Sequence, residues 1–121
     1  KGTITSTASA EFAGCGVRVD RITLTGSEMG MYATIEYTVT DAETFAKTED
    51  GLWFEFVDES GEPLPSGAGT VGTGIVTEDG GMRFVQDLTI QASEELPGQV
   101  RLRAFNCWTK ERYETHVFDL N

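Results

Sequence analysis

The chain has 121 residues and a mass of 13.2 kDa, which is enough for one apolar core and too little for two domains. Its 39% hydrophobic and 24% charged residues are typical of a folded domain and exclude a disordered segment. The net charge of -11 at pH 7 repels phosphate groups and anionic lipids, which excludes nucleic acid and a membrane surface as expected partners.

The first quarter of the chain predicts two extended segments. Residues 3–10 alternate small polar and apolar side chains, which favours a weak strand at a sheet edge, and a turn follows at residues 13–14. Apolar residues then alternate from Cys15 onward but change phase after Val19. Because a strand repeats every two residues, this change predicts a β-bulge near residues 20–21.

The cleanest strand pattern covers residues 31–39, after a glycine-containing hairpin loop at residues 26–30. Apolar side chains occupy one face and Thr and Glu the other, as in an antiparallel strand with one solvated face. In the acidic connection that follows, residues 42–47 can form one helical turn anchored by Phe45. The next strand predicts an inward apolar row made of Leu52, Phe54 and Phe56.

The second half of the chain is less regular. Residues 63–65 (Pro-Leu-Pro) cannot occupy a central strand, and the glycine-rich residues 67–77 predict an irregular or edge strand. Residues 78–81 (Glu-Asp-Gly-Gly) predict a hairpin turn, because glycine adopts positive φ without steric cost. The remaining predicted elements are strands at residues 82–90, 100–105 and 113–120, a loop at 92–99 and a turn at 109–112.

Strand follows strand without crossover helices, and turn signals recur at roughly 8–12-residue intervals. This pattern predicts one all-β domain over residues 1–121, an immunoglobulin-like antiparallel β-sandwich of about seven or eight strands.

Two cysteines, Cys15 and Cys107, lie near opposite ends of the chain. In a sandwich, the first and the penultimate strands can face each other or lie side by side, so the geometry allows a disulfide. Two separate buried thiols are the alternative. The spacing is not C-x-x-C, so neither a redox motif nor a zinc site is indicated.

The single histidine, His116, limits the catalytic arrangements. Cys107 lies on the preceding predicted strand, so the two could be cross-strand neighbours and form a nucleophile and base. Nothing near Cys107 resembles a nucleophile elbow, and no glycine follows it to open an oxyanion hole. We therefore predict that His116 is a strand residue without a catalytic role and that the domain is not an enzyme.

Acidic pairs occur at residues 49–50, 58–59, 78–79 and 94–95, each beside a turn where carboxylates are well solvated. No D-x-D-x-D-G pattern is present, and no Lys-Ser or Lys-Thr follows the glycines of residues 67–74. We predict no metal, phosphate or cofactor site. The acidity has two interpretations, a solvated surface or one that attracts basic partners or calcium.

Two tryptophans carry the remaining binding hypothesis. Trp53 is out of phase with the inward row of its strand, and Trp108 lies at a strand end beside a turn. Exposed tryptophans on a sandwich can stack on sugar rings, whereas buried ones close the ends of the core. Trp53 and Trp108 are thus candidate ligand-stacking residues.

Four segments, at residues 21–25, 32–39, 56–61 and 100–105, carry a family resemblance. Their order resembles that of the immunoglobulin-like extracellular domains of uncharacterised function in Gram-positive bacterial membrane proteins similar to anti-sigma factors. The resemblance implies an extracytoplasmic domain, tethered to a membrane helix outside this sequence. It supplies no catalytic residues.

These observations favour a non-catalytic extracellular module that interacts, senses or acts as a spacer, with a protein or glycan partner of unknown identity. A carbohydrate-binding module using the tryptophans is the alternative. No apolar run reaches the roughly 20 residues that cross a bilayer. The sequence begins with Lys1 rather than Met, so we expect a piece of a longer protein whose targeting segment lies elsewhere.

Overall fold

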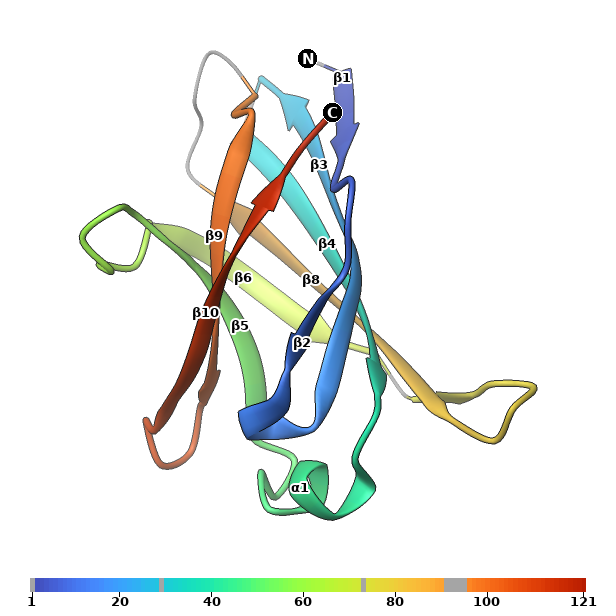
Figure 1. Cartoon of the computed structure of the whole chain (residues 1–121). Helices are drawn as coiled ribbons and strands as arrows, with labels where there is room; N and C mark the ends of the chain where they lie inside the picture. The colour runs from blue at the N-terminus through green and yellow to red at the C-terminus, as the bar shows by residue number, and fades with distance from the viewer. Residues whose placement is uncertain (1, 29, 73, 91–95) are drawn as a thin grey trace.

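The computed structural model describes residues 2–28, 30–72, 74–90 and 96–121, and these form two antiparallel sheets (Figure 1). The larger sheet has seven strands in the order β1-β3-β4-β8-β6, with β2 also paired to β3 and β7 to β8. The smaller sheet has the order β10-β9-β5. The strands are β1 (Gly2–Thr5), β2 (Ala10–Phe12), β3 (Val17–Ser27), β4 (Gly30–Val39), β5 (Leu52–Val57), β6 (Ser66–Val71), β7 (Ile75–Val76), β8 (Met82–Ile90), β9 (Gln99–Asn106) and β10 (Arg112–Asp119).

The predicted all-β sandwich is confirmed, but the described residues contain ten strands rather than seven or eight. One reason is that the predicted strand at residues 3–10 is two strands, β1 and β2. The Ser6 hydroxyl accepts a hydrogen bond from the Ile22 amide at 2.9 Å, and the Thr7 amide then donates to Asp119 in β10 at 3.0 Å. The chain therefore leaves β3 briefly and links the two sheets along this edge. The glycine-rich segment likewise gives two edge strands, β6 and β7.

Several local predictions are confirmed. The pairing of β3 with β4 shifts register between Val19 and Arg21, which is the predicted bulge. Residues 78–81 form the turn between β7 and β8, where Gly80 has φ 85°. The predicted loop at residues 92–99, with its acidic pair at residues 94–95, lies mostly outside the described residues.

The core lies between the two sheets and follows from the side-chain alternation of the strands. In β4, every second residue from Met31 to Tyr37 is buried, and the predicted inward row of β5 is buried as well. The Phe54 ring of β5 contacts Tyr37 of β4 edge-on, with centroids 5.1 Å apart. Alternate burial on facing strands thus joins the sheets through one apolar layer.

The predicted helical turn forms α1 (Ala42–Ala46), and a short 3-10 helix, η1 (Ala13–Cys15), lies beside it. Asp41 caps α1, because its side chain accepts a hydrogen bond from the Thr44 amide at 3.2 Å. Figure 1 shows α1 at one end of the sandwich and both chain termini at the other. Among the described residues, no helix has the length and apolar character needed to cross a membrane.

Candidate functional site

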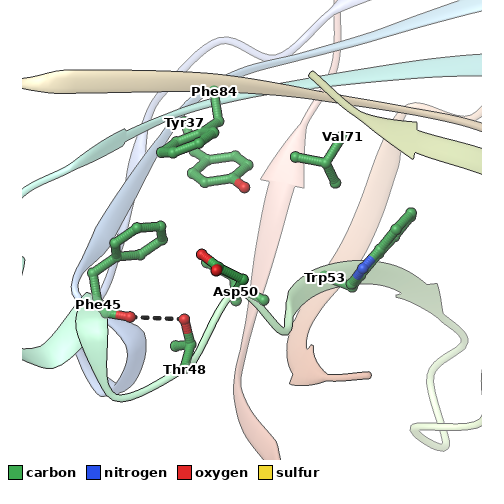
Figure 2. Close-up of a pocket in the computed structure, with 8 residues that line it drawn as sticks. Tyr37, Phe45, Thr48, Asp50, Trp53, Val71 and Phe84 are labelled. Carbon is green, nitrogen blue, oxygen red and sulfur yellow. Dashed lines mark hydrogen bonds between the residues drawn. The ribbon is translucent and has the colours of Figure 1, made fainter. Parts of the chain in front are cut away.

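A pocket of about 230 Å³ lies beside α1, where β5 of the small sheet faces β6 and β8 of the large sheet (Figure 2). The lining residues come from four strands, from α1 and from the segment after it, so no continuous motif encodes them. They are Tyr37, Phe45, Thr48, Asp50, Leu52, Trp53, Val71 and Phe84.

Aromatic rings form one wall of the pocket. Tyr37 and Phe84 are opposite each other in the β4–β8 register, and their rings stack with centroids 5.4 Å apart and planes 18° apart. Phe45 of α1 packs against Phe84 at a centroid distance of 5.5 Å. The wall is therefore built by a cross-strand pair and extended by the residue that anchors α1.

The Tyr37 hydroxyl is the polar group of the aromatic wall. The residue is only 2% exposed, and Figure 2 shows its hydroxyl directed into the pocket between Asp50 and Val71. No hydrogen bond joins this hydroxyl to any part of the chain that the structure describes. Burial raises the pKa of Tyr37 above its ordinary value, so the hydroxyl stays protonated at neutral pH.

Asp50 supplies the charge of the site. Its carboxylate is directed into the same space (Figure 2), and it forms no ion pair or hydrogen bond within the described residues. Glu49 and Asp50 both have left-handed backbone conformations, with φ of 51° and 61°. Such conformations persist where surrounding contacts impose them, and here the preceding Thr48 is the anchor.

Thr48 is 1% exposed and holds the segment before Asp50 through four hydrogen bonds, one of them from its amide to the Phe45 carbonyl at 3.0 Å. Its hydroxyl donates to the Phe45 carbonyl at 2.7 Å, a bond drawn in Figure 2. Its own carbonyl accepts from the Asn106 side chain of β9 and from the Gly51 amide, each at 2.9 Å. The loop that carries the carboxylate is thus tied to both α1 and the small sheet.

Trp53 forms the opposite wall, and the predicted exposure of this residue is only partly correct because its side chain is half-buried. Its indole lies against Gly69 of β6, where an added Cβ would be 3.2 Å from Cζ3 of the indole. That Cβ would also lie 2.8 Å from the Asp87 carbonyl oxygen. Glycine in β6 therefore provides room for the indole.

Trp108 occupies a different environment. It is 71% exposed and does not line the pocket. Its indole lies over Gly51, where an added Cβ would be 2.6 Å from Cδ1 of Trp108. Of the two predicted ligand-stacking residues, only Trp53 is therefore part of the pocket.

The structure separates the residues of the predicted nucleophile and base. His116 pairs with Leu102 in the β9–β10 register, whereas Cys107 lies beyond the end of β9. The hypothesis that they are cross-strand neighbours is wrong, because His116 pairs with Leu102 and Cys107 lies five positions further along the chain. The His116 ring instead contacts Phe12 edge-on, at a centroid distance of 4.5 Å.

Both cysteines are free thiols, Cys15 buried and Cys107 half-buried, so the disulfide that the sequence left open is not formed in the structure. Burial, with a smaller effect of the Glu114 carboxylate, raises the pKa of Cys15 to about 12. Within the described ranges, no group of three or more His, Cys, Asp or Glu side chains is placed to hold a metal ion.

No known protein family, curated protein or solved structure matches this chain. The family resemblance inferred from the strand segments therefore stays a prediction.

Sequence reasoning identified Trp53 but missed Tyr37 and Asp50 as site residues. Tyr37 belongs to an alternating apolar row, which predicts a core residue, and Asp50 belongs to an acidic pair beside a turn. The available signal was that Asp50 directly precedes Gly51 and a strand with an out-of-phase Trp53. That signal is short and common, so it could not single out the site.

Proposed function

We propose that this domain is a non-catalytic binding module whose ligand site is the pocket between β5, β6 and α1. The observation that carries the proposal is the Tyr37 hydroxyl, which has no hydrogen-bond partner among the described residues and is directed from a buried ring into an aromatic pocket. A ligand can use the free donor and acceptor of this hydroxyl, and concave, mainly apolar sites with few polar groups are typical ligand sites.

The proposal includes an immunoglobulin-like architecture, which the strand order supports. The order β3-β4-β8-β6 facing β10-β9-β5 corresponds to the ABED and GFC sheets of constant-type immunoglobulin domains. In this correspondence β1 and β2 form an additional ribbon beside the first strand, and β7 extends the edge next to β6.

The proposed setting is the outer side of a bacterial membrane. There the domain would be part of a membrane-anchored protein and would serve as an interaction, sensing or spacer module. The family resemblance supports this setting. The position of both termini at the end opposite α1 also supports it, because attachment through either terminus leaves the pocket facing away (Figure 1). The coding sequence on either side of this chain tests the setting, and the absence of a signal peptide and membrane helix there would contradict it.

A carbohydrate-binding module is the second candidate function, favoured by the 71% exposure of Trp108. A titration with soluble glycans, followed through the two indole N–H signals in an NMR spectrum, tests it. Sugar binding predicts a saturable shift of the Trp108 signal.

The pocket itself is tested by blocking it. Val71 lies on the edge strand β6 and lines the pocket, so Val71→Phe fills the space without entering the central core. Val117→Phe is the matched control, because Val117 is 49% exposed on the edge strand β10. The three proteins are titrated with a panel of amines, amino-acid derivatives and monosaccharides, and the Trp53 indole N–H signal is followed. We expect some compounds to shift this signal in the native protein and in V117F but not in V71F. Equal binding by V71F would remove the pocket from the function.

A further inference from the structure

The charge and shape of the pocket favour one class of ligand, and the inference about that ligand rests on the proposed binding function. We infer that the pocket binds the protonated end of a lysine or arginine side chain presented by a partner protein, between the Asp50 carboxylate, the Tyr37 hydroxyl and the aromatic walls.

The charge of the pocket points to a cation. Asp50 is the one ionised residue among the eight that line it, and its carboxylate makes no ion pair in the described part of the chain. Lys47, the nearest basic residue in the sequence, does not line the pocket. The whole chain adds a net charge of -11, which attracts a basic partner over a longer range.

The walls suit the same ligand. Tyr37, Phe45, Trp53 and Phe84 surround the space with aromatic rings, whose faces attract ammonium and guanidinium groups. Rings also accept the apolar stem of a lysine or arginine side chain, because the methylene groups pack on them while the charged end reaches a polar group. The protonated Tyr37 hydroxyl keeps an oxygen lone pair that accepts a hydrogen bond from the cation.

A neutral sugar fits less well, because its several hydroxyl groups need several partners. Apart from main-chain atoms, the polar groups of the lining are the Asp50 carboxylate, the hydroxyls of Tyr37 and Thr48 and the Trp53 indole N–H. The Thr48 hydroxyl is already donated to the Phe45 carbonyl at 2.7 Å. A sugar in this pocket of about 230 Å³ would meet few polar side chains on the lining, so several of its hydroxyl groups would gain no protein partner.

Two probes of nearly equal shape test the inference. N-acetyl-lysine methylamide carries the ammonium group, and N-acetyl-norleucine methylamide has a similar stem without the charge. We expect the lysine compound to shift the Trp53 indole signal saturably and the norleucine compound to bind at least about tenfold more weakly. Added salt should weaken the binding of the lysine compound alone.

Two variants locate the contacts. Asp50→Asn should weaken the lysine compound about tenfold, and Tyr37→Phe, which keeps the buried ring, about threefold. Glu62→Gln is the matched control, because Glu62 is an exposed carboxylate in the β5–β6 loop outside the pocket lining. It removes the same charge and should leave the affinity unchanged.

The outcomes separate the inference from the proposed function. If the Trp53 signal reports equal affinities for the two probes, the pocket does not select a cation. The inference is then overturned, but the proposed binding function is kept. Equal losses in D50N and E62Q also overturn it, because the attraction is then general rather than local. If neither probe nor any compound of the wider panel shifts the Trp53 signal, the proposed binding function fails together with the inference.

Discussion

The side-chain amide of Gln86 pairs with the main chain of Phe54 as a neighbouring strand would. Its Nε2 donates to the Phe54 carbonyl at 3.0 Å, and its Oε1 accepts from the Phe54 amide at 2.9 Å. Gln86 belongs to β8 of the large sheet and Phe54 to β5 at the edge of the small sheet, so these bonds cross the core. Since Gln86 is 1% exposed, the pair joins the sheets where water cannot substitute for it.

Replacing Gln86 with Leu should destabilise the domain by roughly 2–4 kcal/mol, because the amide and carbonyl of Phe54 would remain buried without partners. Urea denaturation followed by far-ultraviolet circular dichroism measures the change. Gln99→Leu is the control: its side chain donates to Asp119 at 3.0 Å, but the pair is exposed. A similar loss in both variants would show that the Gln86 bonds have no special role.

Replacing Gly16 with Ala should cost about 2–4 kcal/mol. Gly16 has φ 74°, and an added Cβ would lie 2.5 Å from the Asp41 carbonyl oxygen and 2.8 Å from the Phe45 amide nitrogen. The strain and the clash act on the contact between η1 and α1, the helix that carries Phe45 of the pocket wall. Thermal unfolding measures the effect. Gly72→Ala, where the nearest atom is 3.7 Å away, should be close to neutral, and equal losses would contradict this explanation.

Removing Glu55, the partner of Arg103, should clearly destabilise the domain. Arg103 is 7% exposed, and its Nε donates to Glu55 at 2.8 Å while Nη1 donates to the Gly61 carbonyl at 2.9 Å. Glu55→Ala leaves a buried guanidinium without its counter-charge, so we expect a loss of about 3 kcal/mol in the free energy of unfolding.

The control for this ion pair is Glu36→Ala, which removes the partner of Arg21. Arg21 is bound by Glu36 at 2.6 Å and 3.0 Å, but its side chain is 55% exposed and therefore solvated without the carboxylate. Chemical denaturation should show a clearly smaller loss for E36A than for E55A. The reverse order would mean that burial does not determine the strength of these pairs.

The two thiols should differ sharply in reactivity. Cys15 is buried and its pKa is raised to about 12, so almost no thiolate forms at mildly alkaline pH, whereas Cys107 is half-buried. Iodoacetamide should modify Cys107 in the folded protein and Cys15 only after urea is added, as measured by mass spectrometry of peptides. The Cys107→Ser variant should remain unlabelled until unfolding. A Cys15–Cys107 disulfide in the native protein would contradict the prediction.

Asp58 should contribute to acid sensitivity. The Ser60 hydroxyl at 2.7 Å and the Glu62 amide at 3.0 Å donate to its carboxylate, and these bonds lower the pKa of Asp58 below its ordinary value. A lowered folded-state pKa stabilises the fold above the ordinary pKa of about 4, and this stability is lost as the pH falls through the folded-state value. Urea midpoints measured from neutral to acidic pH should fall less steeply in Asp58→Asn. The same slope in the native protein and in D58N would contradict this role of Asp58.

Local patterns were sufficient for much of the framework. The alternation over β4, the phase change at the β3 bulge and the Gly80-Gly81 turn were all predictable, because each depends on the conformational preferences of neighbouring residues. The division of residues 3–10 into β1 and β2 was not, because Ser6 and Thr7 take partners about 16 and 112 positions away.

The sequence by itself therefore determined an acidic, all-β domain and the inward faces of its main strands. Alternation tells which side of a strand is apolar, but it does not tell which strands face each other or in which register. Only the tertiary structure separated Cys107 from His116, gave Phe54 its partner in Gln86, and brought Tyr37, Asp50 and Trp53 around one pocket. These are long-range contacts, and they are decided when two sheets pack and each buried group must find a partner.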